Sequence, residues 1–532
     1  MADVGNEVAL PDGPVAGTPD KSSKVELVQV STIEPPTLHV RLGAISSRFW
    51  KLSKHLPLLL LMTAYAVRFS DITVNMLRTY RQSAYDMAIP DQGIWLLSRF
   101  HSPFVTVMGK NLFGDHTSFI FLFLVPLDWI YPHTAALLVV QAVLIASGAI
   151  PIYLLALHLL RSTVLATCLA AAYLLSPALQ QGNLEQFHVE AFEAPLLAFA
   201  IYAAVVWRPR LLLVAIAFLL LTKQDVALYT IPIGIWVVIR RKTGVGVAVI
   251  TSSVAVGLLD NVVIIPALLN GIPTTYGGWI PFGGLHGFME IMVRKPGQLW
   301  TYLTSQGRSF YLWQMFFSTG LVFLVAPEIA LLAVLVLGEN VISDFPYQHE
   351  IIYHYSMPPV AILVCGSIYT ISRFSSARRR MLATVAVTGC ALWSCVLWGA
   401  LPFSDGAPSN PNPYLTSDAG IRKLIGEVPP SAVISAAYNF VPNLDHRTQI
   451  YMFPNPFSQA YYGDPAHNGQ ELPSASGVRY LLLPTCISCD GNLKPYQGVF
   501  DRFESQFHEV GRASGVILYE RNIRPLSSAV GQ

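Results

Sequence analysis

The chain has 532 residues, of which 53% are hydrophobic and 12% are charged, and its mean hydropathy is +0.48. A soluble globular protein carries about twice that charged fraction, so the composition excludes this class and predicts a polytopic helical membrane protein. The formal net charge of +2 gives no reason to expect a nucleic-acid partner.

The N-terminal segment, residues 1–45, is rich in Pro, Gly, Ser and Val and has no hydrophobic periodicity. This composition predicts a disordered cytoplasmic arm. No apolar run follows Met1, so the segment is not interpreted as a signal peptide.

Eleven apolar blocks are interpreted as transmembrane helices. They are residues 56–76, 135–160, 163–180, 192–207, 211–222, 225–239, 243–266, 310–325, 327–342, 352–372 and 381–401. A shorter block, 117–131, contains Pro126 and Asp128. If it does not cross, every cluster of Lys and Arg falls on one side of the membrane, which the positive-inside rule assigns to the cytoplasm. The clusters are Arg41 to Lys54, Arg161, Arg208 to Arg210, Arg240 to Lys242 and Arg373 to Arg380. We therefore predict a re-entrant or interfacial hairpin for 117–131.

This topology places the N-terminus in the cytoplasm and the C-terminus outside it, in a multi-pass protein of the inner (plasma) membrane. The segments predicted to lie outside are residues 78–116, 181–191, 222–225, 267–309, 343–351 and 402–532. The unusual polar residues of the chain collect in these segments.

The first outer loop, 78–116, carries Asp86 and Asp91 with Pro90 between them. Pro90 favours the start of a short interfacial helix from Asp91 to Phe100. Asp91 then lies in the first helical turn, where interaction with the helix dipole is an equal alternative to function. Asp86 has no such structural explanation.

The same loop ends with Asp115 and His116. Asp115 is explained by a helix N-cap, whereas His116 is a candidate to contact a carboxylate, a phosphate or a metal. Farther along, His188, Glu190 and Glu193 stand at the entrance of one span, where three ionisable groups suggest a polar cavity.

Lys223 and Asp225 lie between two apolar blocks. They form either a hydrated turn or a site where Lys223 binds a lipid phosphate. Arg308 is a second candidate, because arginine binds phosphate bidentately. His349 and His354 stand with Asp344 and Glu350 without a metal-ligand spacing, so they are expected to line a substrate site.

The polar tail, 402–532, contains the run Ser409 to Pro413 and is predicted to fold as a small α/β domain outside the cytoplasm. A helix is expected at 421–425, and strands at 432–436, 480–483 and 516–519. Cys486 and Cys489 form a CxxC that favours a local disulfide over a metal site outside the cytosol.

Several motifs together resemble a bacterial family known mainly as a predicted membrane protein of unknown function. The motifs are Tyr85-Asp86 with Asp91-Gln92, Gly114-Asp115-His116, Gln186-Phe187-His188 with Glu190-Ala191, Lys223 with Asp225 to Tyr229, His354-Tyr355 with Pro358, and Val441 to Arg447. The family would have His at Asn443 and Glu at Gln224, and these departures weaken any role for those two positions. Members of the family look like the GT-C superfamily of glycosyltransferases, which includes protein mannosyltransferases and the aminoarabinose and arabinosyl transferases.

The resemblance implies an all-α polytopic fold and transfer of a sugar, with inversion, from a polyprenyl-phosphate donor to an extracytoplasmic glycan, lipid or protein. It implies an essential acid in the first outer loop, where Asp86 stands as the catalytic base. Basic residues, Lys223 and Arg308, or a divalent ion would hold the lipid phosphate, and His188 and His354 would line the sugar or acceptor site. The residues expected to bind substrate are Asp91, Gln92, His116, His188, Glu190, Lys223, Asp225, Arg308, His349 and His354.

The predicted organisation is a cytoplasmic arm (1–45), a GT-C-like transmembrane domain (46–401) and an extracytoplasmic domain (402–532). Two other functions remain open. One is a lipid or sugar transporter or flippase, favoured by the break at Lys223 to Asp225. The other is a non-catalytic protein of cell-envelope assembly.

Overall fold

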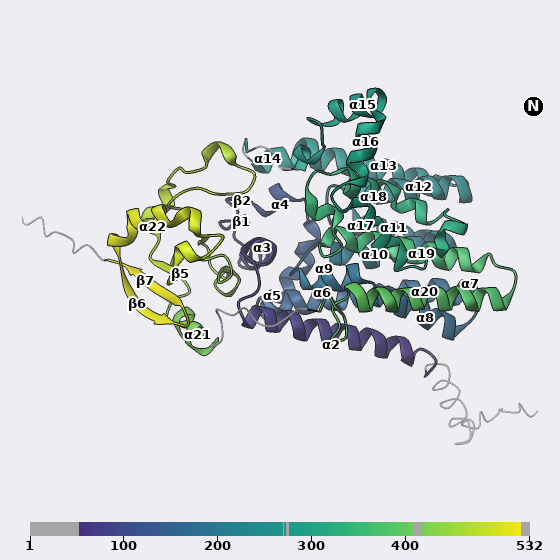
Figure 1. The fold of residues 1–532 in the computed structure, drawn as a ribbon, viewed down its shortest axis with the longest axis horizontal. Helices are drawn as coiled ribbons and strands as arrows, with labels where there is room; N and C mark the ends of the chain where they lie inside the picture. Colours follow the sequence, from purple (N-terminus) through teal and green to yellow (C-terminus); the bar gives the residue numbers. More distant parts are fainter. Residues whose placement is uncertain (1–52, 270, 273–275, 408–417, 523–532) are drawn as a thin grey trace, which may run out of the picture. The chain divides into compact units, whose positions relative to one another are not determined.

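The structure is a computed structural model that describes residues 53–269, 271–272, 276–407 and 418–522. The predicted N-terminal arm and the run Ser409 to Pro413 lie outside the described residues. The described chain has two kinds of structure, a helical region up to residue 398 and a tail that contains a sheet (Figure 1). Both belong to one compact unit that begins at His55.

The helical region is built from many short and a few long helices. Its α-helices are α2 (Leu56–Arg78), α3 (Ile89–Ser98), α4 (Leu112–Asp115), α5 (Val125–Ile130), α6 (Ala135–Ser147), α7 (Ala149–Leu160), α8 (Thr163–Leu174), α9 (Pro177–Leu184), α10 (Glu190–Val206), α11 (Pro209–Leu219), α12 (Ala227–Arg241), α13 (Gly244–Leu259), α14 (Ile265–Leu269), α15 (Leu285–Arg294), α16 (Pro296–Thr304), α17 (Arg308–Phe317), α18 (Val334–Ile342), α19 (Met357–Ser372) and α20 (Ala377–Trp398). A short hairpin, β1 (Phe104–Val105) with β2 (Lys110–Asn111), lies in the first loop.

Five helical stretches of the described chain are long and apolar enough to cross a membrane. They are Leu56–Arg78, Ala135–Leu160, Gly244–Leu269, His354–Ser372 and Ala377–Trp398. A sixth results if α8 and α9, which meet at a bend of 44°, form one span. Other predicted spans fold as shorter helices, such as the 17 residues of α10, which extend about 25 Å against about 30 Å of hydrocarbon. The described chain therefore has several helices that are long and apolar enough to span a membrane, and the number eleven stays a prediction.

The block 117–131 forms a 3₁₀-helix, Phe119–Leu124, that continues into α5. These 12 residues span only about 20 Å, too little to cross the bilayer alone. Asp128 inside the block is buried, and its carboxylate accepts hydrogen bonds from Ser98 (2.6 Å) and Arg99 (3.0 Å) at the end of α3, which compensate for the loss of water. The block thus packs along α3, in line with the predicted interfacial hairpin.

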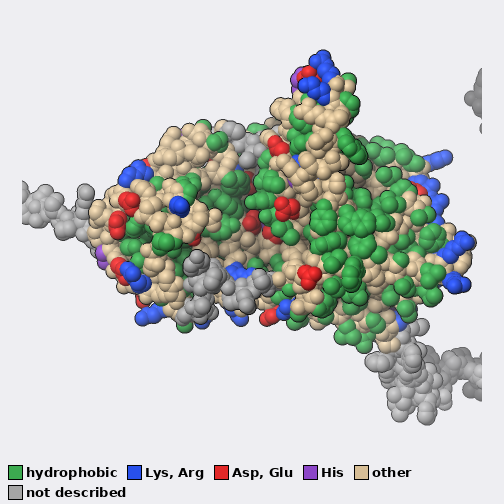
Figure 2. Space-filling model, viewed as in Figure 1, with side chains coloured by type: hydrophobic (Ala, Val, Ile, Leu, Met, Phe, Trp, Pro, Cys, Tyr) green, Lys and Arg blue, Asp and Glu red, His purple; other side chains and the backbone are tan. Residues whose placement is uncertain are grey.

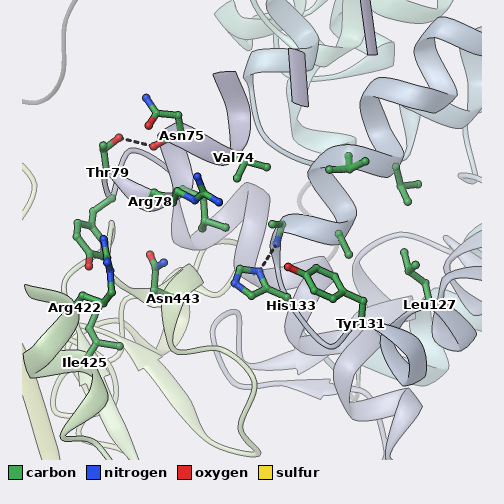
Figure 3. A pocket seen from close by; sticks show the side chains of 16 residues that line it. Val74, Asn75, Arg78, Thr79, Leu127, Tyr131, His133, Arg422, Ile425 and Asn443 are labelled. Atoms are coloured by element: carbon green, nitrogen blue, oxygen red, sulfur yellow. Dashed lines mark hydrogen bonds between the residues drawn. The ribbon is translucent and has the colours of Figure 1, made fainter. Parts of the chain in front are cut away.

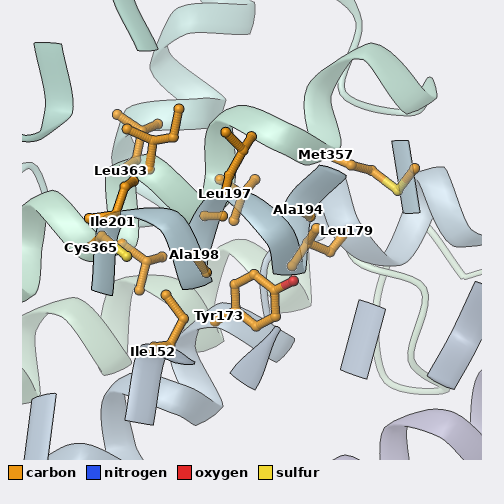
Figure 4. Packing of buried hydrophobic residues seen from close by; sticks show 14 of the residues in the cluster. Ile152, Tyr173, Leu179, Ala194, Leu197, Ala198, Ile201, Met357, Leu363 and Cys365 are labelled. Atoms are coloured by element: carbon orange, nitrogen blue, oxygen red, sulfur yellow. The ribbon is translucent and has the colours of Figure 1, made fainter. Parts of the chain in front are cut away.

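Small side chains let the helices of the core approach one another closely. Ala194 and Ala198 of α10 belong to the same buried cluster as Tyr173 of α8 and Leu363 of α19 (Figure 4). The hydroxyl of the buried Tyr173 donates to the Ile145 carbonyl at 3.1 Å, which satisfies its polar atom inside the apolar core. Such packing of small residues is typical of helices that associate within a membrane.

Basic clusters that the sequence assigns to one side meet in the structure. Glu328 contacts both Arg240 (2.8 Å) and Arg373 (3.6 Å), and Arg241 donates to the Ala204 carbonyl near the end of α10. Figure 2 shows Lys and Arg side chains gathered at the end of the helices on the right of the view. These contacts support the grouping of the clusters on one face of the membrane.

The tail carries a five-stranded sheet in the order β4-β3-β5-β7-β6. The strands are β3 (Ile434–Ala436), β4 (Ile450–Met452), β5 (Tyr480–Pro484), β6 (Phe507–Ala513) and β7 (Val516–Arg521). β3 is parallel to both β4 and β5, whereas β7 is antiparallel to β5 and β6. Two helices, α21 (Asp418–Gly426) and α22 (Gln497–Phe503), accompany the sheet, and Cys486 and Cys489 are joined by a disulfide.

The expected helix and three strands of the tail are therefore present, while β4 and β6 were not predicted. The division of the chain into a domain at 46–401 and a domain at 402–532 stays a prediction.

Candidate functional site

Asp86 lies in a π-helical turn, Ala84–Ala88, directly before α3. Ser83 caps this turn: its hydroxyl accepts from the Asp86 amide (3.1 Å) and donates to the Asp86 carboxylate (2.9 Å). Gln186 links the turn to the loop before α10, because its side chain accepts from the Ser83 amide at 2.6 Å and donates to Asp86 at 3.5 Å. The carboxylate of Asp86 is thus oriented by neutral donors and remains partly exposed.

The exposed side of Asp86 faces a cavity of about 910 Å³ between the helical region and the tail. Its polar and charged lining residues are Asp86, Asp115, His116, Ser118, Glu185, Gln186, His188, Glu190, Lys223, His354 and Asn492. Its aromatic lining residues are Tyr85, Phe121, Phe187, Trp279, Phe345, Tyr347, Tyr353, Tyr355, Tyr438, Phe453, Tyr462 and Tyr496. Six of the eleven residues predicted for the site, Asp86 among them, line this one cavity.

Glu185, His188 and His354 form a compact group on the cavity wall. The Glu185 carboxylate accepts from the backbone amide of His354 (2.5 Å) and contacts the rings of His354 (3.0 Å) and His188 (3.8 Å). The two imidazole rings stack with their centroids 3.7 Å apart. One ligand atom of each residue lies within 4.8 Å of the other two, so the group could hold a divalent cation.

Burial controls the charge of this group. It raises the pKa of Glu185 to about 8, against the opposing effect of His188. Burial also lowers the pKa of His188, and the stacked His354 acts in the same direction. At neutral pH the group therefore holds a carboxylic acid beside neutral imidazole, in the absence of a cation.

Lys223 places a positive charge beside this group. Its ammonium contacts Glu190 at 2.9 Å and Asp225 at 3.5 Å, and it lies 5.5 Å from the centre of the Tyr355 ring. Glu190 also approaches His354 at 3.8 Å. Lys223 and Glu190 line the cavity, whereas Asp225 does not.

His116 and Asp115 occupy the part of the wall contributed by the first loop. The His116 Nδ1 lies 3.2 Å from the Gln224 side-chain oxygen. Asp115 pairs with Lys110 at 3.1 Å. Burial alone would raise the pKa of Asp115, but His116 and Lys110 outweigh it and hold this pKa below its usual value. Asp115 is therefore not an N-cap but the anion of a buried ion pair.

Asp91 and Gln92 do not line the cavity. As predicted, Pro90 and Asp91 lie in the first turn of α3, but the Asp91 carboxylate points to His446, 3.1 Å away. Gln92 is fully buried and uses both side-chain atoms structurally, accepting from the Thr106 amide and donating to the Arg447 carbonyl, each at 3.1 Å. Both residues connect α3 to the tail.

Arg308 and His349 are also outside the cavity. Arg308 is completely buried, and its guanidinium donates to the carbonyls of Val341 (2.8 Å) and Ser343 (2.9 Å) and to the Tyr302 hydroxyl (2.8 Å). The guanidinium donors of Arg308 are thus used in hydrogen bonds within the protein, and the structure does not bring Arg308 to a phosphate site. His349 is buried in the neighbouring segment, where burial and Arg308 lower its pKa.

Sequence reasoning missed Glu185 and the tyrosines of the tail. Glu185 directly precedes the Gln186 to Glu190 motif, so its position was a usable signal. Tyr438 and Tyr462 lie edge-on to Tyr85, at 6.1 and 5.5 Å between ring centres. No motif marks these tyrosines, because only the packing of the tail brings them to Asp86.

A family model described as "Predicted membrane protein (DUF2079)" matches residues 77–470. The chain belongs to this family. The family expected from the motifs is thereby confirmed. No curated protein matches the sequence.

The solved structures that resemble this DUF2079 protein include the following two. One is the crystal structure of ArnT from Cupriavidus metallidurans in the apo state, with a TM-score of 0.48, 11% identity, and coverage of 86% of this chain and 98% of that chain. The other is the Archaeoglobus fulgidus oligosaccharyltransferase in the apo form, with a TM-score of 0.35, 11% identity, and coverage of 80% and 70%. Both TM-scores are below 0.5, so function is inferred from the residues of the site.

This DUF2079 protein has a second large groove, of about 1090 Å³, outside the site (Figure 3). Arg78 of α2 and Arg422 of α21 line it, and Val139 and Val140 of α6 form part of its apolar wall. None of the eleven residues predicted for the site lines it.

Proposed function

We propose that this protein is an integral membrane glycosyltransferase that moves a sugar from a polyprenyl-phosphate donor to a hydroxyl group of an extracytoplasmic acceptor. The observation that carries the proposal is the placement of Asp86. Its carboxylate faces a large aromatic cavity, and among the described residues no Lys or Arg forms an ion pair with it. A carboxylate held by neutral donors can still accept a proton from a substrate.

Asp86 is the general base in this proposal. It takes the proton of the acceptor hydroxyl while the acceptor oxygen attacks the anomeric carbon from the face opposite the phosphate. The bond from the anomeric carbon to the phosphate oxygen breaks, and the lipid phosphate leaves with the electron pair. The configuration at the anomeric carbon is inverted, because a single displacement occurs.

The departing phosphate needs positive charge on the other wall of the cavity. Lys223 offers an ammonium there, although Glu190 at 2.9 Å offsets part of its charge. Glu185, His188 and His354 are the residues that would hold a divalent cation, which would supply additional charge stabilisation. Arg308 is withdrawn from this role because its donors are already used inside the protein.

The aromatic lining suits a sugar. Aromatic faces cover the apolar C–H surface of a pyranose or furanose ring, and tyrosine hydroxyls bond its hydroxyl groups. Burial raises the pKa of Tyr85 to about 12, so this residue remains a neutral hydroxyl donor beside Asp86. The cavity volume of about 910 Å³ admits a sugar together with part of an acceptor.

Purified protein in proteoliposomes tests the base assignment. With a panel of labelled polyprenyl-phosphate pentoses and hexoses and envelope extracts as acceptor, the wild type should transfer label. Asp86→Asn should lower the rate by about 10²–10⁴-fold, because general-base catalysis contributes that much. Asp344→Asn is the matched control, since Asp344 is an exposed acid of an outer loop that does not line the cavity. Full transfer by Asp86→Asn would refute the base assignment.

Transport of a lipid or sugar is the second candidate function. It is favoured by the bend of 44° between α8 and α9, which leads to Glu185, since transporters often bind substrate at broken helices. The same proteoliposomes separate the two functions. A transporter moves the labelled donor across the bilayer unchanged, whereas a transferase produces labelled acceptor and free polyprenyl phosphate.

A further inference from the structure

Two carboxylates and an imidazole meet where α3 touches the tail, away from the cavity that holds Asp86. Asp91 comes from α3, and Asp445 and His446 come from the segment before β4. One ligand atom of each lies within 4.8 Å of the other two, and the Asp91 carboxylate is 3.1 Å from His446 Nε2. Nothing in the proposed transfer reaction uses this group.

Asp445 lacks a partner for part of its charge. It is 1% exposed, and its Oδ2 makes no hydrogen bond within the described part of the chain. The neighbouring Arg447 attracts Asp445 electrostatically but forms no direct ion pair with it in the described chain, because its guanidinium donates to the carbonyls of Leu444 (2.5 Å) and Ala432 (2.9 Å). Protonated His446, a proton shared between the carboxylates, or a bound cation can each supply the positive charge that two buried carboxylates in contact require.

The segments that carry the three residues are held rigidly on both sides. Gln92, next to Asp91, donates to the carbonyl of Arg447, next to His446, at 3.1 Å. One turn farther along α3, Trp95 stacks over the His446 ring at 6.1 Å. The donor atoms are therefore brought together by contacts that do not depend on a ligand, as in a preorganised metal site.

We propose that Asp91, Asp445 and His446 bind a divalent transition-metal cation that fastens the tail to α3. Two carboxylates balance the charge of such a cation, and neutral imidazole is a ligand suited to zinc. Asp445 and His446 line a small cavity of about 270 Å³, which has room for a water ligand.

His133 faces the same small cavity but is not expected to bind the metal. Its Nδ1 accepts from the Ala135 amide at 3.0 Å (Figure 3). The neutral ring therefore carries its proton on Nε2, which leaves no free lone pair for a metal. Water completes the proposed coordination.

The metal content of the full-length protein tests the proposal. Purified wild type is stripped with a chelator, incubated with zinc, separated from free ion by gel filtration and analysed by elemental mass spectrometry. Asp445→Asn and His446→Gln should each hold one zinc fewer per chain than the wild type. His467→Gln should match the wild type, because His467 also pairs with an aspartate (Asp464, 2.7 Å) but belongs to neither group of three potential ligands.

The difference in zinc content between the wild type and Asp445→Asn reports on this site alone, because Asp445→Asn leaves Glu185, His188 and His354 intact. Equal zinc content in wild type and His446→Gln would overturn the proposal. The proposal would also be overturned if Asp445→Asn has a higher Tm than the wild type both with and without zinc. That result indicates a proton shared between Asp91 and Asp445 instead of a metal.

A second measurement uses thermal unfolding with zinc and with chelator. Saturating zinc should raise the Tm of the wild type by about 3 °C more than that of Asp445→Asn, which keeps Glu185, His188 and His354. If Asp445→Asn does not fold, Asp91→Asn takes its place, because it removes a different ligand. A zinc-dependent rise of equal size in the variant would overturn the proposal.

Discussion

At the scale of single residues, the same type of side chain has different roles according to what surrounds it. Lys223 and Arg308 both looked like phosphate ligands in the sequence. Lys223 lines the cavity with its ammonium beside Glu190, whereas Arg308 is completely buried and donates to backbone carbonyls. A sequence shows that a charge sits near a span, but it does not show which groups of the fold already use that charge.

Asp86 and Asp91 illustrate the same difference. Both acids stand in the first outer loop, and the helix-start pattern correctly placed Asp91 in the first turn of α3. The sequence did not indicate its partner, because His446 is 355 residues away along the chain. Asp86, in contrast, accepts hydrogen bonds from the neutral groups of Ser83 and Gln186 and remains partly exposed to a substrate.

The ion pair of Asp115 with Lys110 should make stability depend on acid pH. Because the folded protein holds the pKa of Asp115 below its usual value, the pair contributes stability that is present above about pH 4 and is lost as pH falls through the lower folded pKa. Asp115→Asn should lower Tm near neutral pH and show a smaller further loss on acidification than the wild type. Thermal unfolding in detergent as a function of pH measures both effects.

Asp501→Asn is the control for this prediction, because Asp501 is an exposed residue of α22. Its Tm should follow that of the wild type at every pH. Parallel pH profiles for Asp115→Asn and the wild type would contradict the role given to the ion pair.

At the scale of elements, helix contacts depend on positions where a side chain has no room. α12 and α13 cross closely at Gly234 and Gly246. A Cβ at Gly246 would lie 2.7 Å from the Gly234 carbonyl oxygen and 2.7 Å from the Val238 amide nitrogen. Both neighbours are backbone atoms, so the contact can be relieved only by moving the helices apart.

Gly246→Ala should therefore destabilise the protein by about 1–3 kcal/mol, the usual effect of overpacking. Gly244→Ala is a matched control two residues away, because a Cβ there meets nothing within 4 Å. Thermal or denaturant unfolding of the two variants in the same detergent measures the difference. Equal stability of the two variants would show that the close crossing does not contribute.

At the scale of the whole molecule, the site is built from segments far apart in the chain. The first loop contributes Asp86, the loops before α10 and α19 contribute Glu185 and His354, and the tail contributes Tyr438 and Tyr462. If the tail lies outside the cytoplasm, as the distribution of basic residues predicts, the cavity opens to the same side.

The orientation can be tested by labelling cysteines. In a chain whose other four cysteines are replaced by alanine, reduced Cys486 and Cys489 should react with a membrane-impermeant maleimide in intact spheroplasts. A cysteine introduced as Arg210→Cys, in a chain without other cysteines, should react only after permeabilisation. The predicted topology would be reversed if, in intact spheroplasts, the Arg210→Cys chain is labelled and the chain that keeps Cys486 and Cys489 is not.

The sequence by itself determined the class of the protein, its family and several local elements. Long apolar blocks predicted membrane helices, and period and turn signals predicted α3, α21 and three strands of the tail, because these depend on residues close together in the chain. The motifs also indicated Asp86, His188, Glu190, Lys223 and His354, which line one cavity.

Only the tertiary structure decided which polar residues share a site. It brought Tyr438 and Tyr462 to Asp86, joined Asp91 to Asp445 and His446, and occupied Arg308 and Gln92 with backbone groups. Burial and hydrogen bonding are properties of the packed chain, and they determine whether a charge is free to act on a substrate. Spacing along the sequence carries no record of them when the partners are hundreds of residues apart.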